Sequence, residues 1–149
     1  MTLFDQISED IKAAMKARAK VRLETLRNIK KVFLEVKTAP GSDGELKDDA
    51  ALKIIQKLAK QGKETAQTYI DNNRQDLADE ELAQVKVLEE YLPKQLSEEE
   101  ITTAVKDIIT KTGATSMKEM GKVMGMASKV LAGKADGKII SAIVKKLLA

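Results

Sequence analysis

The amino-acid sequence predicts an all-α fold, because residues that break helices are scarce and apolar residues recur at helical spacing. Only 2 prolines and 8 glycines occur among 149 residues, whereas lysine, glutamate, leucine and alanine are abundant. Apolar residues make up 43% of the chain, which is enough to build a modest core. We expect an N-terminal helical domain over residues 1–92 and a small C-terminal three-helix domain over residues 93–149, joined by a short proline-containing hinge.

The N-terminal part contains several stretches with a helical period. Apolar residues recur at this period over residues 3–36, which predicts one long helix or two helices joined near Ala19. The segment TAPGSDGELKD then breaks the pattern with a proline and glycines. Further helices are predicted from about residue 48 to residue 69 and over residues 77–92, with the polar segment DNNRQD as a loop or helix junction between them.

The C-terminal part begins at Pro93, which cannot continue the preceding helix and marks the expected hinge. Ser97 and Glu100 have the spacing of a capping box, so a helix is predicted to start after Ser97. Helix ends are expected at Gly113 and near Gly133, and an aspartate three residues after Gly133 is suited to cap the last helix. These signals divide the C-terminal part into three helices.

Cysteine and histidine are both absent from the sequence. Their absence excludes disulfides, cysteine and serine–histidine nucleophiles, histidine acid–base chemistry and nearly all zinc and copper sites. No acidic cluster has the spacing of a carboxylate metal site. We therefore predict no catalytic residues, no metal, no cofactor and no small-molecule substrate.

The hydropathy pattern gives an expectation about location. The first residues include Asp5, Glu9 and Asp10 and lack the apolar core of a secretion signal. No run approaches the roughly 18 consecutive apolar residues that span a bilayer. We expect a cytoplasmic protein without a membrane partner.

Positive charge is concentrated in the C-terminal part, although the net charge of the whole chain is only +3. Residues 1–92 hold 16 lysines and arginines and 17 acidic residues, whereas residues 93–149 hold 10 and 6. A second basic run extends over residues 12–37, with nine basic residues against Glu24 and Glu35. A polyanionic partner could contact two separate patches, although solvated helix faces would give the same charge pattern.

The segment MGKVMGMASKVLAGKADG, residues 120–137, contains four of the eight glycines and invites comparison with a phosphate-binding loop. A Walker loop requires G-x-x-x-x-G-K-[ST] after a strand. Here Gly133 and Lys134 are followed by Ala135, and Ser128 stands at the position of the first glycine. Because the motif fails twice and no strand precedes it, a kinase or nucleotidase is disfavoured.

On a helix, residues 117–132 would sort into three adjoining stripes at about 100° per residue. One stripe is apolar, the next has almost no side chains, and the third is basic. The apolar stripe contains Met120, Val123, Met124, Ala127, Val130 and Leu131; the small stripe contains Gly121, Gly125, Ser128 and Ala132; the basic stripe contains Lys118, Lys122 and Lys129.

Glycines inside a helix cost roughly 1 kcal/mol each relative to alanine, so close approach of another backbone is expected to offset this loss. That backbone could belong to a neighbouring helix of the same unit, or to a nucleic acid held by the lysines. Only four aromatic residues occur, so a folded RNA backbone matches better than a single strand that needs stacking platforms. Lysines beside the start of the last helix would add donors where backbone N–H groups favour anions. The predicted RNA-binding residues are Lys118, Gly121, Lys122, Gly125, Lys129, Gly133, Lys134 and Lys138.

Charged residues elsewhere are interpreted mainly as structural. Arg22 falls within an apolar stripe and is expected either to snorkel to the surface or to pair, for example with a carboxylate of a neighbouring helix. Arg27 and Lys31 point elsewhere on that helix and could join an RNA surface. Arg74 and Asp76 are expected to cap and pin a helix junction rather than bind a ligand.

Six short motifs are distributed over the whole chain: RLETLR at 22–27, NNRQDL at 72–77, YLP at 91–93, QLSEEE at 95–100, GKVMG at 121–125 and GKADG at 133–137. Together they resemble the YqeY family. The resemblance implies an N-terminal helical domain followed by a domain similar to the tail of GatB, a component of the glutamyl-tRNA(Gln) and aspartyl-tRNA(Asn) amidotransferase. In that enzyme the tail contacts tRNA, and its glycine and lysine motif corresponds here to residues 121–125 and 133–135. One departure is Ala19, where the family usually has an aspartate that would cap the second helix.

The resemblance to the amidotransferase covers its tail and not its catalytic core. The chain lacks a glutaminase nucleophile and an ATP site, so any label of carbon–nitrogen ligase with glutamine as amido-N-donor would be inherited by homology. We expect a non-catalytic accessory protein that binds tRNA or a tRNA-bearing complex. The alternatives are a helical protein–protein interaction adaptor without RNA binding, and an accessory component that belongs to a glutamine-dependent amidotransferase only in a complex.

Overall fold

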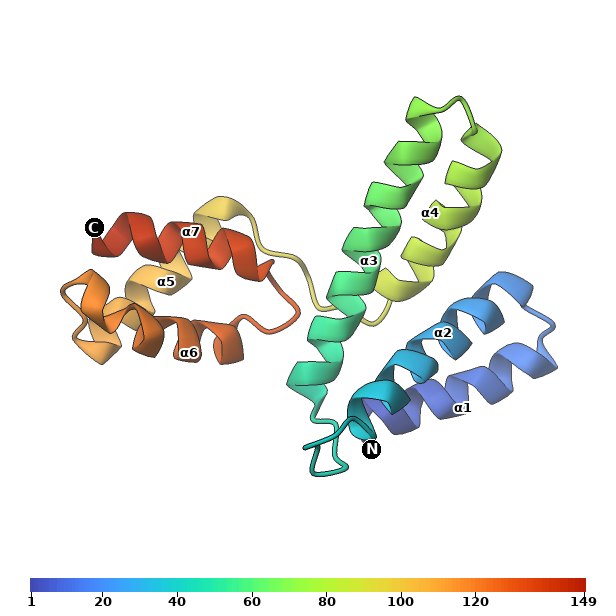
Figure 1. Cartoon of the computed structure of the whole chain (residues 1–149), viewed down its shortest axis with the longest axis horizontal. Helices are drawn as coiled ribbons and strands as arrows, with labels where there is room; N and C mark the ends of the chain where they lie inside the picture. Colours follow the sequence, from blue (N-terminus) through green and yellow to red (C-terminus); the bar gives the residue numbers. More distant parts are fainter. The chain divides into compact units, whose positions relative to one another are not determined.

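The computed structural model describes all 149 residues as seven α-helices and one short 3-10 helix, with no strand (Figure 1). The predicted all-α class is confirmed. The chain divides into two compact units, Met1–Leu92 and Pro93–Ala149, which are described separately. None of the helices combines the length and the apolar character that crossing a membrane requires.

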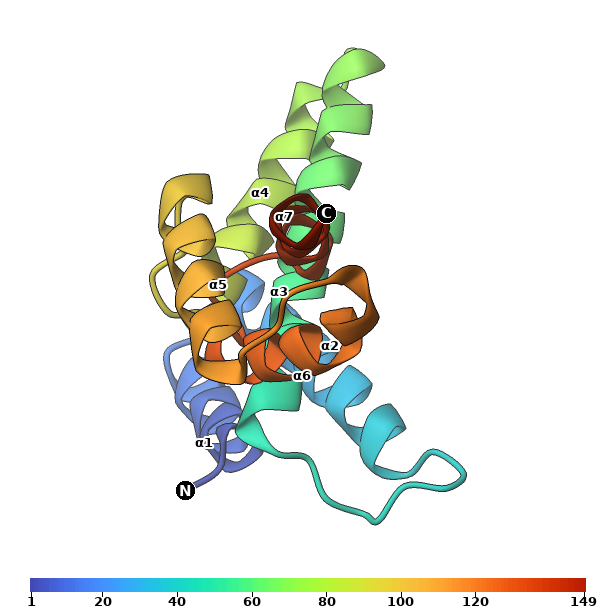
Figure 2. The same ribbon diagram turned by 90° about the vertical axis from the view of Figure 1, so that its left-hand side faces the viewer.

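The N-terminal unit consists of two helical hairpins (Figures 1 and 2). The first contains α1 (Leu3–Lys16) and α2 (Lys20–Lys37), and the second contains α3 (Asp48–Asp71) and α4 (Gln75–Glu89). The predicted joint near Ala19 is confirmed, because Arg18 adopts a left-handed φ of 55° between α1 and α2. Asn73, with a φ of 59°, makes the corresponding turn in the second hairpin.

Small residues let α3 and α4 approach each other closely. Ala59, Gly62 and Ala66 are buried on one side of α3. A Cβ atom at Gly62 would lie only 2.6 Å from Cγ2 of Val85 on α4. Because real Cβ contacts are longer, the missing side chain of Gly62 allows this helix spacing. Larger side chains fill the rest of the core, which includes Ile7, Leu26, Ile29, Phe33 and Ile55.

The C-terminal unit packs three α-helices around its own apolar core (Figures 1 and 2). They are α5 (Glu98–Thr112), α6 (Met120–Val130) and α7 (Gly137–Leu148), and the 3-10 helix η1 (Met117–Glu119) leads directly into α6. Each helix contributes fully buried or nearly buried side chains, among them Ile101 and Val105 from α5, Val123 from α6 and Val144 from α7. The core therefore fixes which face of α6 remains for contact with a partner.

The predicted caps of the C-terminal helices are confirmed. Ser97 Oγ accepts a hydrogen bond from the Glu100 N–H at 3.1 Å, and the Glu100 carboxylate accepts one from the Ser97 N–H at 3.2 Å. Gly113 ends α5 with a left-handed φ of 70°. At the start of α7 the Asp136 carboxylate accepts a hydrogen bond from the Lys138 N–H at 3.0 Å.

Two predicted helices have different limits in the structure. The helix expected over residues 77–92 begins two residues earlier and ends at Glu89, with turn residues before Pro93. The single helix expected over residues 117–132 is wrong, because η1 occupies its start and α6 ends at Val130. The Glu119 carboxylate accepts a hydrogen bond from the N–H of a preceding loop residue at 2.5 Å, and Gly133 turns the chain after α6 with a φ of 74°.

Candidate nucleic-acid interface

The two glycines of α6 lie on an open face of the helix. Gly121 and Gly125 are exposed, and a Cβ atom at either position would meet no atom within 4 Å. The core lies on the other side of α6, where Val123 and Ala127 are 0% exposed. The interpretation that a neighbouring helix of the unit packs on these glycines is therefore wrong. Nothing within the unit offsets their cost in helix stability.

The apolar stripe predicted for α6 is confirmed in its centre and wrong at one edge. Val123, Ala127 and Leu131 are buried, and the two methionines of the stripe are partly buried against the same core. Val130, however, is 52% exposed. It lies about 100° around the helix from Leu131, which is 3% exposed, and is therefore at the edge of the stripe rather than over the core. Val130 therefore belongs to the exposed surface.

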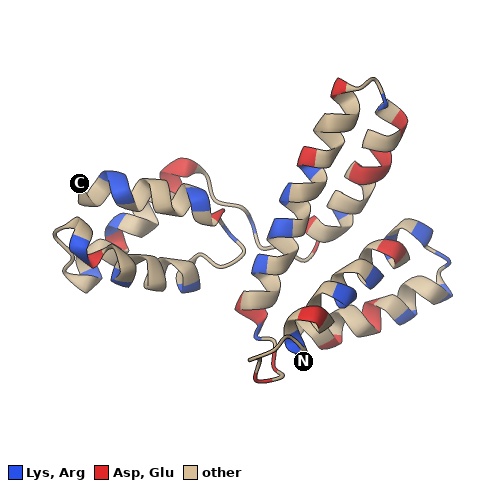
Figure 3. Cartoon of the chain, viewed as in Figure 1, with Lys and Arg blue, Asp and Glu red and all other residues tan.

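All five lysines of the predicted site are exposed, and none forms an ion pair with a carboxylate. Lys122 and Lys129 are seven residues apart on α6, so they project within about 20° of each other, next to Gly125. Lys118 precedes them on η1, Lys134 lies between α6 and α7, and Lys138 is in the first turn of α7. Figure 3 shows these basic positions spread along α6 and at the start of α7.

Few carboxylates oppose this positive charge. Residues 117–149 contain seven lysines and only two acidic residues, Glu119 and Asp136. Both carboxylates accept hydrogen bonds from backbone N–H groups, those of Thr115 and Lys138 respectively. The surface of α6 and of the following segment therefore has a net positive potential that attracts polyanions.

Gly133 contributes to the predicted site through its backbone. It is buried, and its carbonyl oxygen accepts a hydrogen bond from Gln95 Nε2 at 2.6 Å. The carbonyl oxygen of Lys134 accepts a hydrogen bond from the Leu96 N–H at 2.9 Å. These two bonds fix the backbone from which the exposed Lys134 side chain projects. Gln95 was missed by the sequence analysis, because its partner lies 38 residues away in the chain.

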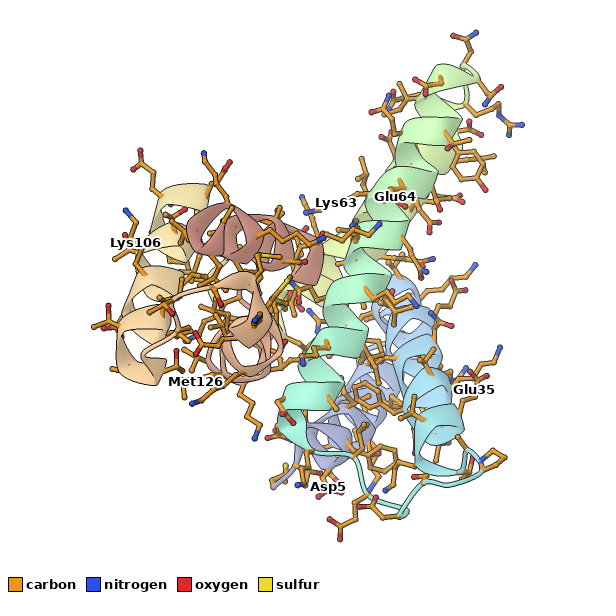
Figure 4. The ribbon with its side chains drawn as sticks, turned by 60° about the vertical axis from the view of Figure 1, so that its left-hand side comes forward. Asp5, Glu35, Lys63, Glu64, Lys106 and Met126 are labelled. Atoms are coloured by element: carbon orange, nitrogen blue, oxygen red, sulfur yellow. The ribbon has the colours of Figure 1, made fainter.

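An apolar margin accompanies the lysines on α6. Met126 is 39% exposed and, like Val130, lies on the side of the lysines away from the glycines. Figure 4 shows Met126 at the outer surface of the unit. The sequence analysis assigned no role to Met126. Its helical position next to the basic stripe would have been sufficient to predict that it lies beside the lysines.

A polar cluster joins α4 to the first hairpin of the N-terminal unit. Arg22 pairs with Glu90 at 2.5 Å, which confirms the predicted pairing with a carboxylate, and this hydrogen bond raises the pKa of Arg22. The Tyr91 hydroxyl donates a hydrogen bond to Asp10 at 2.5 Å. Burial, followed by this hydrogen bond, raises the pKa of Tyr91. The cluster therefore holds the end of α4 against α1 and α2.

Arg74 and Asp76 form an ion pair at the turn between α3 and α4, as the predicted pinning requires, but the Arg74 side chain does not cap α4, because it makes no capping hydrogen bond at the N-cap position. Two nitrogen atoms of Arg74 contact the two carboxylate oxygens of Asp76 at 3.2 and 3.1 Å. The hydrogen bond from Arg74 is the main reason that the pKa of Asp76 lies below its ordinary value. Arg74 and Asp76 therefore stabilise a turn.

No group of three acidic side chains in the chain is placed to hold a metal ion.

Comparison with known proteins places the chain in a family. The family described as Yqey-like protein matches residues 4–148, and so includes both units. The chain belongs to the YqeY family. The YqeY match confirms the resemblance identified from the sequence motifs.

Relatives of this YqeY protein carry two different names. A glutamyl-tRNA(Gln) amidotransferase subunit from Methanobrevibacter smithii is 32% identical over 148 residues, which are 97% of this chain and 22% of the relative. Altered inheritance of mitochondria protein 41, mitochondrial, of Vanderwaltozyma polyspora is 30% identical over 120 residues, 76% of this chain and 64% of the relative. A protein of the same name from Pyrenophora tritici-repentis is 27% identical over 147 residues, 96% of this chain and 79% of the relative.

The extent of these matches differs from what the sequence motifs implied. The similarity to the Methanobrevibacter smithii protein covers both units, whereas the amidotransferase likeness was expected for the C-terminal domain. This chain spans less than two thirds of the length of the first two relatives named above.

Proposed function

We propose that the C-terminal unit binds the sugar–phosphate backbone of a folded RNA, with tRNA as the RNA class, and that the protein is a non-catalytic accessory factor. The observation that carries this proposal is the uncovered glycine face of α6 beside Lys122 and Lys129. Without side chains at Gly121 and Gly125, a ribose–phosphate chain can approach the helix backbone. The adjacent ammonium groups then neutralise phosphates and release bound counterions.

Lysines outside α6 extend the same contact. Lys134 projects from a backbone segment fixed by two hydrogen bonds, and Lys138 lies in the first turn of α7. Exposed lysines without carboxylate partners are available to phosphates, and phosphate contacts position an RNA without reading its sequence. The proposed site therefore recognises the shape and charge of the backbone rather than the bases.

The name of one relative supports tRNA as the RNA class. A protein named as part of a glutamyl-tRNA(Gln) amidotransferase is similar to this chain over both units. We also propose that the chain associates with such a tRNA-bearing complex. In that case the other proteins of the complex would carry out the amide-forming reaction. A cytoplasmic location stays a prediction, since relatives named as mitochondrial proteins have a comparable identity to the chain.

A protein–protein adaptor is the second candidate function, and the exposed Met126 and Val130 favour it. Apolar side chains at a surface contribute to protein interfaces, and these two lie next to the basic positions of α6. In that case a partner helix, rather than RNA, would cover the glycines. Binding to tRNA distinguishes the two functions.

The test is the affinity of the full chain for bulk tRNA, measured by fluorescence anisotropy at several salt concentrations. We expect tight binding at low salt that weakens steeply as salt rises. The double variant Lys122→Gln with Lys129→Gln should lower the magnitude of the slope of log affinity against log salt by about 2, because two phosphate contacts are lost. Lys106→Gln with Lys111→Gln on α5 removes equal charge from the same unit and serves as the control, although Lys111, unlike Lys122 and Lys129, is paired with Asp107 at 3.1 Å (Lys106 is labelled in Figure 4).

Two results would overturn RNA binding at α6. One is no tRNA binding at low salt while a protein co-purifies with the chain, which would favour the adaptor. The other is an equal effect of the α6 and α5 double variants. A separate assay addresses catalysis: the pure chain given mischarged Glu-tRNA, glutamine and ATP should form no Gln-tRNA.

A further inference from the structure

The outer face of α2 carries a second group of basic side chains, on the N-terminal unit. Arg27, Lys30 and Lys31 lie within five residues of one another. Together with Leu34, Glu35 and Thr38 they line an open depression of about 390 Å³. Figure 4 shows Glu35, from the same face, pointing away from the rest of this unit. The depression is therefore accessible to a partner.

The cations on this face form no ion pair with a carboxylate, in contrast to two other basic residues of the same hairpin. Arg22 pairs with Glu90 at 2.5 Å and Lys12 pairs with Glu9 at 3.3 Å. Arg27 and Lys31, one helical turn apart, form no ion pair, although Glu24 and Glu35 lie on the same helix. Like charges at this spacing repel each other, and an anion bound between them would relieve the repulsion.

Aromatic contacts organise the inner edge of the group. Lys37 Nζ lies 4.1 Å from the centroid of the Phe4 ring, and Lys30 Nζ lies 5.9 Å from it. Phe4 in turn contacts the buried Phe33, with ring centroids 6.4 Å apart. The two lysines are thereby directed toward α1, and Arg27 and Lys31 are left as the outward-facing cations.

We propose that this face of α2 is a second contact for the phosphate backbone of the same RNA that binds α6, an inference that rests on the proposed function. A guanidinium and an ammonium one turn apart match successive phosphates, and Arg27 can bind a phosphate in a bidentate manner. The depression is shallow and has no aromatic side chain among its lining residues, so it suits a backbone rather than a base or an enclosed small molecule. Contacts on two units increase the affinity of one RNA by raising the effective concentration of the second contact.

The experiment compares double variants of the full chain in the same tRNA titrations. Arg27→Gln with Lys31→Gln removes the α2 contact, and Lys122→Gln with Lys129→Gln removes the α6 contact. The control is Lys53→Gln with Lys57→Gln, two exposed residues at the same spacing on α3. We expect the α2 variant to bind tRNA about tenfold more weakly at low salt, and the magnitude of its slope of log affinity against log salt to fall by about 2. The affinity of the control should stay within about twofold of that of the natural sequence.

Each result decides between the two proposals. If the α6 variant loses affinity and the α2 variant behaves like the α3 control, RNA binding at α6 stands and the α2 contact is overturned. If only the α2 variant loses affinity, RNA binding at α6 fails, and with it the proposal that α2 is a second contact for an RNA bound there, although α2 itself then contacts the RNA. Absence of tRNA binding to the natural sequence overturns both. The charge-conserving variant Arg27→Lys with Lys31→Arg should keep the salt slope, and a loss equal to that of the glutamine variant would contradict a charge-based contact.

Discussion

Gly62 and Gly121 show the same residue type in opposite environments. Gly62 faces Val85 across the α3–α4 interface, whereas Gly121 faces open space at the start of α6. The first glycine allows two helices to approach, and the second leaves helix backbone accessible. The same substitution therefore has opposite expected effects on stability at the two positions.

Gly62→Ala should destabilise the N-terminal unit. The new Cβ atom would lie 2.6 Å from Val85 Cγ2, so either the stiff, β-branched Val85 side chain or the two helices would have to shift. Overpacking of this kind destabilises a protein by about 1–3 kcal/mol. Replacing glycine by alanine inside a helix stabilises it by only roughly 1 kcal/mol, so we expect a net loss of stability. Urea denaturation followed by circular dichroism measures the change in the free energy of unfolding. An increase in stability would contradict the close packing of the two helices.

Gly121→Ala should stabilise the C-terminal unit by about 0.5–1 kcal/mol, because alanine is the better helix former and its Cβ meets nothing. The same denaturation experiment measures this gain, with Gly62→Ala as the contrasting substitution. A loss of stability would mean that the glycine face of α6 is covered.

The sequence predicted the kind of partner that Arg22 requires, but a role that depends on the close packing of two helices was not predictable. The position of Arg22 in an apolar stripe predicted a carboxylate partner, which is Glu90. The role of Gly62 had no sequence signal, because it depends on Val85 in a different helix. Val130 was assigned to the core because helical periodicity does not show how far around α6 the core contact extends.

The start of α2 is the weakest cap of the N-terminal unit. Ala19 occupies the N-cap position without a side-chain hydrogen bond, and no acidic residue lies in the first turn. Ala19→Asp should increase the free energy of unfolding by about 1 kcal/mol, because the carboxylate can accept an orphan N–H and favours the helix dipole. Thermal or urea denaturation checks this gain, with Ala17→Asp as the contrasting substitution, because Ala17 is the C-cap of α1 and a carboxylate there opposes the helix dipole. Equal effects of the two substitutions would contradict a capping role for position 19.

The capping box of α5 has an expected pH dependence. Hydrogen bonds from the Ser97 N–H and from the Ser97 side chain lower the pKa of Glu100. A carboxylate whose pKa is lowered by folding stabilises the folded state at pH values above its ordinary pKa. This stabilisation is lost as the pH falls through the lower pKa that the group has in the folded state. Stability should therefore fall below about pH 4.5 less steeply in Glu100→Gln than in the natural sequence. Identical acid unfolding profiles would contradict the cap.

Ser97→Ala should decrease the free energy of unfolding by about 1 kcal/mol at neutral pH, because the Glu100 N–H loses its side-chain acceptor. Denaturation of the variant measures this loss, and Ser97→Asp, which can accept the same hydrogen bond, should restore most of it. A loss that Ser97→Asp fails to restore would point to a different role for Ser97.

Helix boundaries with local signals were predicted well, and boundaries set by tertiary contacts were not. Ser97, Gly113 and Asp136 all act through their own backbone or nearby residues, so their types and spacing were sufficient. The segment that follows α6 is held by hydrogen bonds from Gln95 and Leu96 to the carbonyl oxygens of Gly133 and Lys134. No property of residues 117–132 alone predicts those bonds.

At the scale of the molecule, each unit has a core of its own, and each has a basic face without carboxylate partners. The lysines and glycines of the α6 site were recognisable from the sequence. The sequence could not decide whether a neighbouring helix covers Gly125, because that depends on how α5 and α7 pack. The structure leaves this position open, and RNA docking depends on that opening.

The most direct test of this docking is the tRNA affinity of the Gly125→Leu variant at one fixed low salt concentration. The leucine side chain meets no atom of the protein at its Cβ and raises helix propensity, so the variant should fold with unchanged or greater stability. Its bulk should keep a ribose–phosphate backbone away from α6, and we predict a loss of affinity of about tenfold with all lysines in place. Unchanged tRNA affinity in a stably folded Gly125→Leu variant would contradict the docking of RNA on this face.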